Sequence, residues 1–390
     1  MVTVKMNYFK FHPVGQGLFY TGSLANGYYN FVYDCGTVSG KYYLDNAINR
    51  YVKEMGHKIN EKPNIDFVVI SHLHADHFNG IKLLKAKANI KKIYLPYLGN
   101  NEDLITLFLA GSIITSVINS EGEYEENIFD SLRFMRSLYG FGERDETETA
   151  FIGSQPNRDF EDPEFVYQEE LIKMQVNDKD YWSFALINRR FNDGKIFELI
   201  EEIHDMLIAY NVDSVLSLID KVSLKEIAKI YTDIFGTGQN LTSTVLLHYP
   251  DFRRSYMQYL RAPNNSLHNY RHYKFYSCIC HEDRLIESIM KTTSLLTGDI
   301  EINKDVADII RRINDQFDEA IGVLQIPHHG SWRNYNFMKS ESIDAEIYVA
   351  SYGLGNIYKH PSNRTIGDLH KHNKKYYSSN QFEIFDYCIF

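Results

Sequence analysis

Residues 71–80 have the sequence SHLHADHFNG and directly follow the apolar run IDFVVI at 65–70. The apolar run predicts a short strand that is buried on both faces. His72 and His74 are two residues apart at its carboxyl end, where extended backbone directs both side chains the same way. Asp76 and His77 follow on the next turn. Imidazole and carboxylate groups are common ligands of divalent ions, so this stretch predicts a metal site at a strand end.

Two other predicted strands end in the same types of side chain. Asp299 follows the strand in TSLLTGD, and His328 and His329 follow IGVLQI in PHHGS. Taken singly, an aspartate after a strand is often a turn former or a helix N-cap, and adjacent histidines after a proline are often loop residues. Together, three strand-end loops that supply carboxylates and imidazoles predict an open metal site in a layered α/β fold.

Strand and helix signals divide the chain into three parts. Residues 1–99 and 238–390 are rich in predicted strands, and residues 100–237 are predicted to form a mainly helical insertion between them. In the insertion, KIFELIEEIHDMLIAY predicts a helix whose buried face is formed at helical spacing by Ile196, Phe197, Ile200, Ile203 and Leu207. The acidic stretch 142–165 before this helix is expected to be an exposed loop.

Seven motifs occur in an order that is typical of one protein family. They are VGQG at 14–17, YDCG at 33–36, SHLHADHFNGI at 71–81, NLTSTVLL at 240–247, LLTGD at 295–299, IPHHGS at 326–331 and NIYKHPS at 356–362. With these motifs the sequence resembles the metallo-β-lactamase-fold hydrolases, and most of all the hydrolase domain of the ComEC-type competence proteins and its soluble relatives. The resemblance covers both strand-rich parts but not residues 100–237.

The resemblance implies an α/β (α+β) fold, a four-layer αββα sandwich with two divalent ions along one edge of the sheets. Zn²⁺ is expected, with Mn²⁺ as the alternative. The first ion would be bound by His72 and His74, and Asp299 would bridge the two ions. The second ion would be bound by Asp76, His77 and one histidine of PHHGS, with His328 preferred over His329.

Supporting residues around the ligands also follow from the resemblance. Asp34 matches an aspartate that holds the HxHxDH loop by hydrogen bonds, and Ser243 is expected among the residues that support the ligands. Asn240 occupies the position at which many family members have a third histidine for the first ion. An amide oxygen is a poor zinc ligand, so the first site is expected to be weaker, to prefer Mn²⁺ or to be completed by water and substrate. His248 is an alternative ligand, although a buried structural role is favoured for it.

The resemblance implies a metal-dependent hydrolase, with DNA or nucleotides as the expected substrates and phosphodiester cleavage by a metal-activated water as the reaction. Asp76 would then be essential, and His329 or His360 would donate a proton to the leaving oxygen. No G-x-S-x-G motif indicates a serine nucleophile. The alternatives are a hydrolase of small molecules such as cyclic nucleotides or lactones, and a metal-binding subunit of a multi-protein complex.

Residues 253–276 combine cations with tyrosines and contain no acidic residue. Such a combination is typical of surfaces that bind single-stranded nucleic acid, although a solvated hairpin would have the same composition. The candidate substrate-binding residues are Arg253, Arg254, Tyr256, Arg271 and Lys274.

Composition restricts the remaining possibilities. The net charge of −10 argues against general adhesion to nucleic acid. Four cysteines are too few and too scattered for a disulfide framework, and CICH at 278–281 is expected to be part of a core strand. We see no signal peptide and no membrane-spanning run, so a cytoplasmic location is expected. The helical insertion is a candidate surface for a protein partner.

Overall fold

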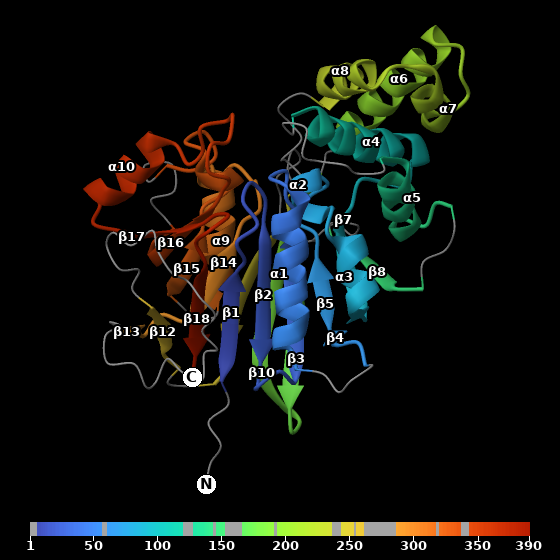
Figure 1. The fold of residues 1–390 in the computed structure, drawn as a ribbon. Helices are drawn as coiled ribbons and strands as arrows, with labels where there is room; N and C mark the ends of the chain where they lie inside the picture. Colours follow the sequence, from blue (N-terminus) through green and yellow to red (C-terminus); the bar gives the residue numbers. More distant parts are fainter. Residues whose placement is uncertain are drawn as a thin grey trace.

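The computed structural model describes residues 6–56, 61–119, 128–142, 146–152, 166–190, 193–235, 243–252, 255–260, 286–316, 320–336 and 343–390. Within these residues two β-sheets pack face to face, and helices cover the outer face of each sheet (Figure 1). The predicted αββα sandwich is therefore confirmed.

The first sheet joins strands from both ends of the chain. In spatial order it contains β13 (Ile286–Ile289), β12 (Met257–Leu260), β18 (Phe385–Ile389), β1 (Asn7–Phe11), β2 (Phe19–Leu24), β3 (Tyr29–Cys35), β5 (Phe67–Val69), β7 (Lys92–Pro96) and β8 (Glu148–Ile152). Strands β3, β5, β7 and β8 are parallel, so their carboxyl ends meet at one edge. Strand β18 pairs antiparallel with β1, with Phe385 opposite Phe11 and Ile389 opposite Asn7.

The second sheet is built mainly from the C-terminal half of the chain. In spatial order it contains β17 (Lys375–Ser379), β16 (Ala345–Ser351), β15 (Ile321–Gln325), β14 (Thr293–Leu296), β11 (Val245–Pro250), β10 (Lys179–Arg190) and β9 (Val166–Val176). Strands β14 to β17 are parallel. Two short strands, β4 (Asn64–Ile65) and β6 (Asn89–Ile90), form a separate pair.

The covering helices bury one apolar stripe each. Helix α1 (Lys41–Glu54) buries Leu44, Ala47, Ile48 and Tyr51, which share one helix face, and packs with α3 (Ile81–Lys87) on the first sheet. On the second sheet, α9 (Lys304–Gln316) and α10 (Asn363–Lys371) likewise bury apolar side chains against the outer face of the sheet. Among the described residues, no helix combines the length and the apolar character needed to cross a membrane.

The core between the sheets is aromatic and encloses His248 of β11. The imidazole stacks on Phe9 at 5.0 Å between ring centroids and lies 5.2 Å from the ring of Phe31. Its Nε2 atom is 2.8 Å from the hydroxyl of Tyr20. Burial lowers the pKa of His248 to about 3. This position agrees with the expected structural role of His248 and not with a ligand role.

The buried His248 predicts a pH dependence of stability. In the unfolded chain a histidine titrates near pH 6.5, whereas in the folded protein His248 stays neutral to about pH 3. Below about pH 6.5 the unfolded state therefore binds a proton that the folded state does not. The free energy of unfolding should fall by about 1.4 kcal/mol per pH unit from this group. Urea unfolding of the wild type and of His248→Gln at pH 7, 6 and 5 measures the effect, and parallel pH profiles would contradict it.

The helices between residues 100 and 237 form two groups and not one continuous block. The first group is α4 (Glu102–Asn119) and α5 (Ile128–Leu138), and the second is α6 (Asp193–Ala209), α7 (Val215–Lys221) and α8 (Leu224–Phe235). Between the groups lie β8, β9 and β10, which belong to the sheets. The prediction of a mainly helical range 100–237 misses these three strands, and β8 falls in the stretch that the sequence predicts to be a loop.

The sequence does contain a signal for the β9–β10 hairpin. Asn177 and Asp178 link the strands with positive φ angles of 53° and 60°, as a two-residue type I′ turn requires. On β10, Trp182, Phe184 and Leu186 alternate into the core between the sheets. The expected stripe of α6 is also corrected in part: Ile203 and Leu207 are buried, but Phe197 is 65% exposed.

The insertion helices lie at one end of the sandwich, with α4 next to the short helix α2 (Ala75–Phe78) (Figure 1). Helix α4 is apolar on all sides and buries most of its residues among its neighbouring helices. The insertion is therefore anchored beside the segment that contains Asp76 and His77.

Candidate metal centre

The histidine-rich segment follows β5 at the edge where the parallel strands of the first sheet end. His72 is fully buried, His74 is the N-cap residue of α2, and Asp76 and His77 lie on the first turn of that helix. The change from strand to helix within these few residues directs all four side chains toward one region, as the sequence predicts.

Asp34 holds this segment in place from the end of β3. Its carboxylate accepts hydrogen bonds from the backbone N–H and the hydroxyl of Ser71, at 2.6 and 2.7 Å. The same carboxylate is 2.7 Å from Nδ1 of His77. A proton on Nδ1 leaves Nε2 of His77 as the atom with a free lone pair, which is how a carboxylate commonly orients a metal-binding histidine.

Two groups of side chains could each hold a cation. The first consists of His72, His74 and Asp299, and the second consists of Asp76, His77 and His329. In each group the possible ligand atoms lie within 4.8 Å of one another. All six residues follow strands of the two sheets, so the groups form where the carboxyl ends of these strands meet.

Asp299 lies between the two groups. Its Oδ2 atom is 3.7 Å from Nε2 of His72, and its Oδ1 atom is 3.3 Å from Nε2 of His77. One oxygen therefore faces each group, which is the arrangement that a bridging carboxylate requires.

Buried atoms without partners show that the site suits a cation. Nε2 of His77 and Oδ1 of Asp299 are both buried and lie 3.3 Å apart, but neither makes a hydrogen bond of good geometry to a described residue. Leaving such atoms unpaired is costly, and a divalent ion would satisfy both. The donor set of imidazoles and carboxylates suits Zn²⁺ and also Mn²⁺.

Protonation favours metal binding at the first group. Burial and the neighbouring rings of His77 and His74 lower the pKa of His72 well below its usual value, so this ring is neutral at pH 7. Without a cation, burial acts to raise the pKa of Asp299, but the protonated rings of His328 and His77 outweigh it and hold that pKa well below its usual value; a bound cation would displace the proton on Nε2 of His77. A neutral imidazole and an ionised carboxylate are the forms that bind metals.

The sequence favours His328 as the metal ligand of the PHHGS motif, but the structure places His329 in that position. His329, and not the preferred His328, lies in the second group, with Nε2 3.1 Å from Oδ2 of Asp76. The backbone carbonyl of Ser351, 2.8 Å from Nδ1, fixes this ring. His328 has a 33% exposed side chain and lies 3.8 Å from Asp299. Both histidines have positive φ angles in a tight turn, η3 (His328–Gly330), and this backbone geometry is not visible in the sequence.

His360 lies at the rim of the site. Its ring centroid is 5.4 Å from that of His328, and its Nδ1 atom is buried without a hydrogen-bond partner among the described residues. The side chain of Asn356 bonds both the N–H and the carbonyl of His360. This clamp holds the loop 352–362 in one conformation next to the two ligand groups.

A buried glutamine that no sequence motif marks holds the loop before Asp299. Oε1 of Gln325 accepts hydrogen bonds from the N–H groups of Thr297 and Gly298, at 2.8 and 2.9 Å. Its Nε2 donates to the carbonyl of Gly298 at 3.1 Å. The one signal in the sequence is a polar residue at the end of the apolar strand GVLQI.

Replacing Gln325 with alanine should weaken metal binding by roughly 10- to 100-fold, the usual cost of losing a support behind a ligand. Without the amide, the Thr297–Gly298 turn no longer holds Asp299 between the two groups. Competition with a chromophoric chelator measures the affinity. Gln175→Ala, on the exposed part of β9, is the control, and equal affinities in both variants would show that the clamp has no role.

The remaining candidate residues differ in where they lie. Tyr256 stacks on Phe390 beside Met257, which pairs with Ile389 at the end of the first sheet opposite the metal centre. We therefore remove Tyr256 from the substrate site: strand pairing, which the sequence does not specify, sends it to the far end. Asn240, Arg253, Arg254, Arg271, Lys274 and the CICH stretch lie outside the described residues. Ser243 is buried next to Thr244, whose N–H donates to the carbonyl of Ser71.

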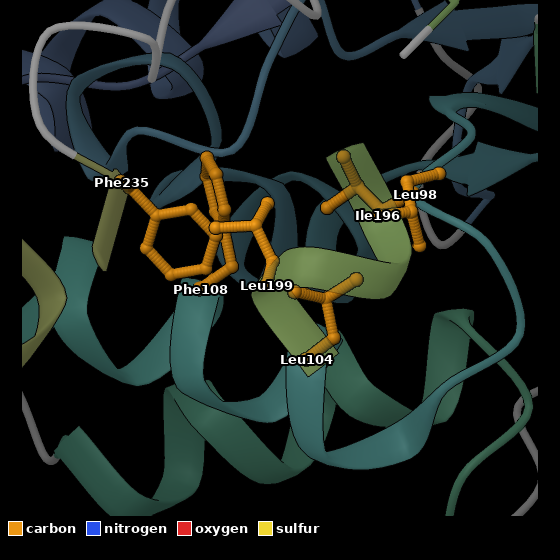
Figure 2. A pocket seen from close by; sticks show the side chains of 6 residues that line it. All are labelled: Leu98, Leu104, Phe108, Ile196, Leu199 and Phe235. Atoms are coloured by element: carbon orange, nitrogen blue, oxygen red, sulfur yellow. The ribbon is translucent and has the colours of Figure 1, made fainter. Parts of the chain in front are cut away.

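An apolar recess lies beside the first ligand group. It is lined by Leu98, Leu104, Phe108, Ile196, Leu199 and Phe235. Figure 2 shows these side chains converging from α4, α6 and α8 and from the loop after β7. The ring of Phe108 is stacked 6.5 Å from the ring of His74, so the recess and the ligand group share one wall.

A family model of known proteins agrees with this geometry. Residues 26–103, which include the HxHxDH segment, match the model of the Metallo-beta-lactamase superfamily. Among solved structures, the chain is similar to the metallo-beta-lactamase fold protein YhfI from Bacillus subtilis, with 9% identity, a TM-score of 0.38, and coverage of 98% of this chain and 100% of that chain. It is also similar to the chemotaxis sensor ODP, solved as a peroxy diiron species, with 20% identity, a TM-score of 0.18, and coverage of 25% of this chain and 37% of that one. No curated protein sequence matches the chain.

Proposed function

We propose that this protein, with its metallo-β-lactamase superfamily segment at 26–103, is a metal-dependent hydrolase that cleaves phosphodiesters in DNA or nucleotides, as its resemblance to ComEC-type hydrolases implies. The observation that supports hydrolysis most is the pair of ligand groups that share Asp299. A pair of divalent ions, when bound, lowers the pKa of water and neutralises developing negative charge. The residues around the two ligand groups determine where the substrate would lie relative to the bound ions.

The charge of two loops at the site favours an anionic substrate. Residues 327–336 contain His329, and residues 352–365 contain His360. Together they include the exposed cations Arg333, Lys359 and Arg364 and no acidic residue. In a chain of net charge −10, such a local excess attracts anions such as phosphates.

The candidate proton donors to the leaving oxygen are His329 and His360. His329 lies within a ligand group, so a role as proton donor is less suited to it than to His360. His360 is close to the ligand groups but belongs to neither of them. We therefore assign the donor role to His360. Burial and the neighbouring rings of His329 and His328 lower its pKa to about 4, so a bound anionic substrate would have to raise that pKa before the ring can donate a proton.

A panel of substrates tests the proposal. A fluorescent single-stranded oligonucleotide, a cyclic dinucleotide, bis(p-nitrophenyl) phosphate and a lactone would be incubated with protein reconstituted with Mn²⁺ or Zn²⁺. We expect cleavage of the phosphodiesters, loss of cleavage in Asp76→Ala, and full activity in the control Asp205→Ala on the exposed face of α6. Full activity of Asp76→Ala would contradict the site, and turnover of the lactone alone would contradict the substrate class.

The second candidate is a hydrolase of small molecules such as cyclic nucleotides or lactones. The recess next to His74 is lined by six apolar side chains and has room for about one water molecule, so it does not by itself select a substrate. Faster turnover of small diesters or lactones than of oligonucleotides would favour this candidate. A metal-binding subunit with a partner on the insertion would show no hydrolysis with either ion and would co-purify with another protein.

A further inference from the structure

The two ligand groups are unequal because they share Asp299. Besides this carboxylate, the second group supplies three side chains, whereas the first supplies only the imidazoles of His72 and His74. Zn²⁺ takes four ligands and Mn²⁺ commonly takes six. The first ion would therefore have room for a further ligand from the protein.

His328 lies next to the oxygen of Asp299 that faces the first group. Its Nε2 atom is 3.8 Å from Oδ2 of Asp299, and Nε2 of His72 is 3.7 Å from the same oxygen. Two atoms that bind one zinc ion at about 2.0–2.2 Å are at most about 4.3 Å apart. Both separations lie below this limit and beyond hydrogen-bond distance. Oδ2 of Asp299 therefore has two imidazole nitrogens at distances that suit a shared ion.

The buried side chain of Asn334 determines which nitrogen of His328 can bind a metal. Nδ2 of Asn334 donates a hydrogen bond to the backbone carbonyl of Asp299 at 2.9 Å. Its Oδ1 atom, which can only accept, is 3.1 Å from Nδ1 of His328. The proton of the neutral ring therefore lies on Nδ1, and Nε2 has the lone pair. A hydrogen bond on the far nitrogen commonly orients metal-binding histidines in this way.

The backbone of the turn lets two adjacent histidines face different ligand groups. His328 and His329 have φ angles of 49° and 55°. His329 thereby lies beside Asp76 in the second group, and His328 lies beside Asp299. The N–H of His328 also donates to the carbonyl of Gly298 at 3.1 Å, which ties the turn to the residue before Asp299.

We propose that His328 is a ligand of the first ion, together with His72, His74 and Asp299, so that the PHHGS motif supplies one histidine to each ion. The inference deepens the proposed function, on which it rests for the presence of two ions. His328 lies outside the set of ligand atoms that are within 4.8 Å of one another. Its ring would therefore move toward the ion on binding, and its 33% exposed side chain has room to do so.

The test compares His328→Asn with a matched control, His360→Asn. Asparagine tolerates the positive φ angle of residue 328 and is a poor zinc ligand. The ring of His360 is 5.4 Å from that of His328, so the control measures the loss of a neighbouring rim imidazole. Zn²⁺ and Mn²⁺ are titrated into metal-free protein in competition with a chromophoric chelator.

One of the two ions should bind to His328→Asn about 100-fold or more weakly than to the wild type. The loss of a ligand costs at least as much as the loss of a support behind a ligand, which is roughly 10- to 100-fold. The other ion should bind as it does in the wild type, and His360→Asn should keep both affinities. Because only one ion is affected, a general loss of the fold cannot account for the result.

Double variants assign the affected ion. His74→Ala should weaken the first ion alone. Adding His328→Asn to His74→Ala should leave the second ion in place, since both histidines act on the first ion. Adding His329→Asn to His74→Ala should weaken the second ion as well. If the addition of His328→Asn instead weakened the second ion, the inference would be overturned.

Three results in the single variants would also overturn it: wild-type affinity for both ions in His328→Asn, an equal loss of both ions, or an equal loss in His360→Asn. If His328→Asn loses the first ion but the wild type hydrolyses no phosphodiester, the proposed function fails and the inference stands. If the wild type hydrolyses phosphodiesters and His328→Asn binds both ions as tightly, the inference fails and the proposed function stands.

Discussion

Replacing Asp299 with alanine should reduce phosphodiester hydrolysis by roughly 10³-fold or more and lower the metal content of the protein. Asp299 places one oxygen toward each ligand group, so its loss weakens both sites at once. Metal-ion stabilisation of the transition state is worth several kcal/mol, and each 1.36 kcal/mol corresponds to a tenfold change in rate. Initial rates and metal analysis by mass spectrometry measure the two effects.

Asp305→Ala provides the control, because Asp305 is an exposed carboxylate on the first turn of α9. This variant should keep the rate and the metal content of the wild type. If Asp299→Ala binds two ions as tightly as the wild type does, Asp299 does not bridge the sites. The role of the shared carboxylate would then have to be abandoned, although His72 and His77 would remain candidate ligands.

The centre of the site is predictable from sequence where its geometry is local. His72, His74, Asp76 and His77 lie within six residues, and one strand followed by one helical turn is enough to direct them to the same region. Asp299 is predictable for a related reason, since polar residues at the ends of parallel strands share one edge of a sheet. In both cases the position of the ligand is predicted by the direction in which side chains alternate along a strand and by the residue at which the strand ends.

Features that depend on backbone turns or on distant pairing are not predictable in the same way. Which of His328 and His329 faces Asp76 is decided by two positive φ angles and by the carbonyl of Ser351. The sequence around Tyr256 has a composition that suits substrate binding. However, the pairing of β12 with β18 places Tyr256 at the end of the sheet opposite the metal centre. The role of Gln325 depends on four backbone groups that only the fold brings around it.

Removing the metal should lower the melting temperature by several degrees. The ligand groups place Asp299, His72, His77 and His329 almost fully out of solvent. In the absence of a cation, Nε2 of His77 and Oδ1 of Asp299 are buried without a hydrogen bond, which is destabilising. A cation that binds only the folded state stabilises it by about 4 kcal/mol when present at 1,000 times its Kd. Calorimetry of chelator-treated protein, before and after addition of Zn²⁺ or Mn²⁺, measures the shift. A melting temperature that does not respond to either ion would contradict the metal site.

The loss of stability should also be local. Hydrogen exchange should increase in α2 and in the turn at 297–299, because the metal would tie these segments together across the two sheets. The β1–β18 pair should change little, since a continuous ladder of backbone hydrogen bonds and aromatic packing in the inter-sheet core hold it. In Asp299→Ala the same segments should exchange quickly with or without metal. This pattern would show that the cation joins the ends of strands from the two sheets. A cation that binds elsewhere and stabilises the whole fold would slow exchange equally in the ligand segments and in the β1–β18 pair.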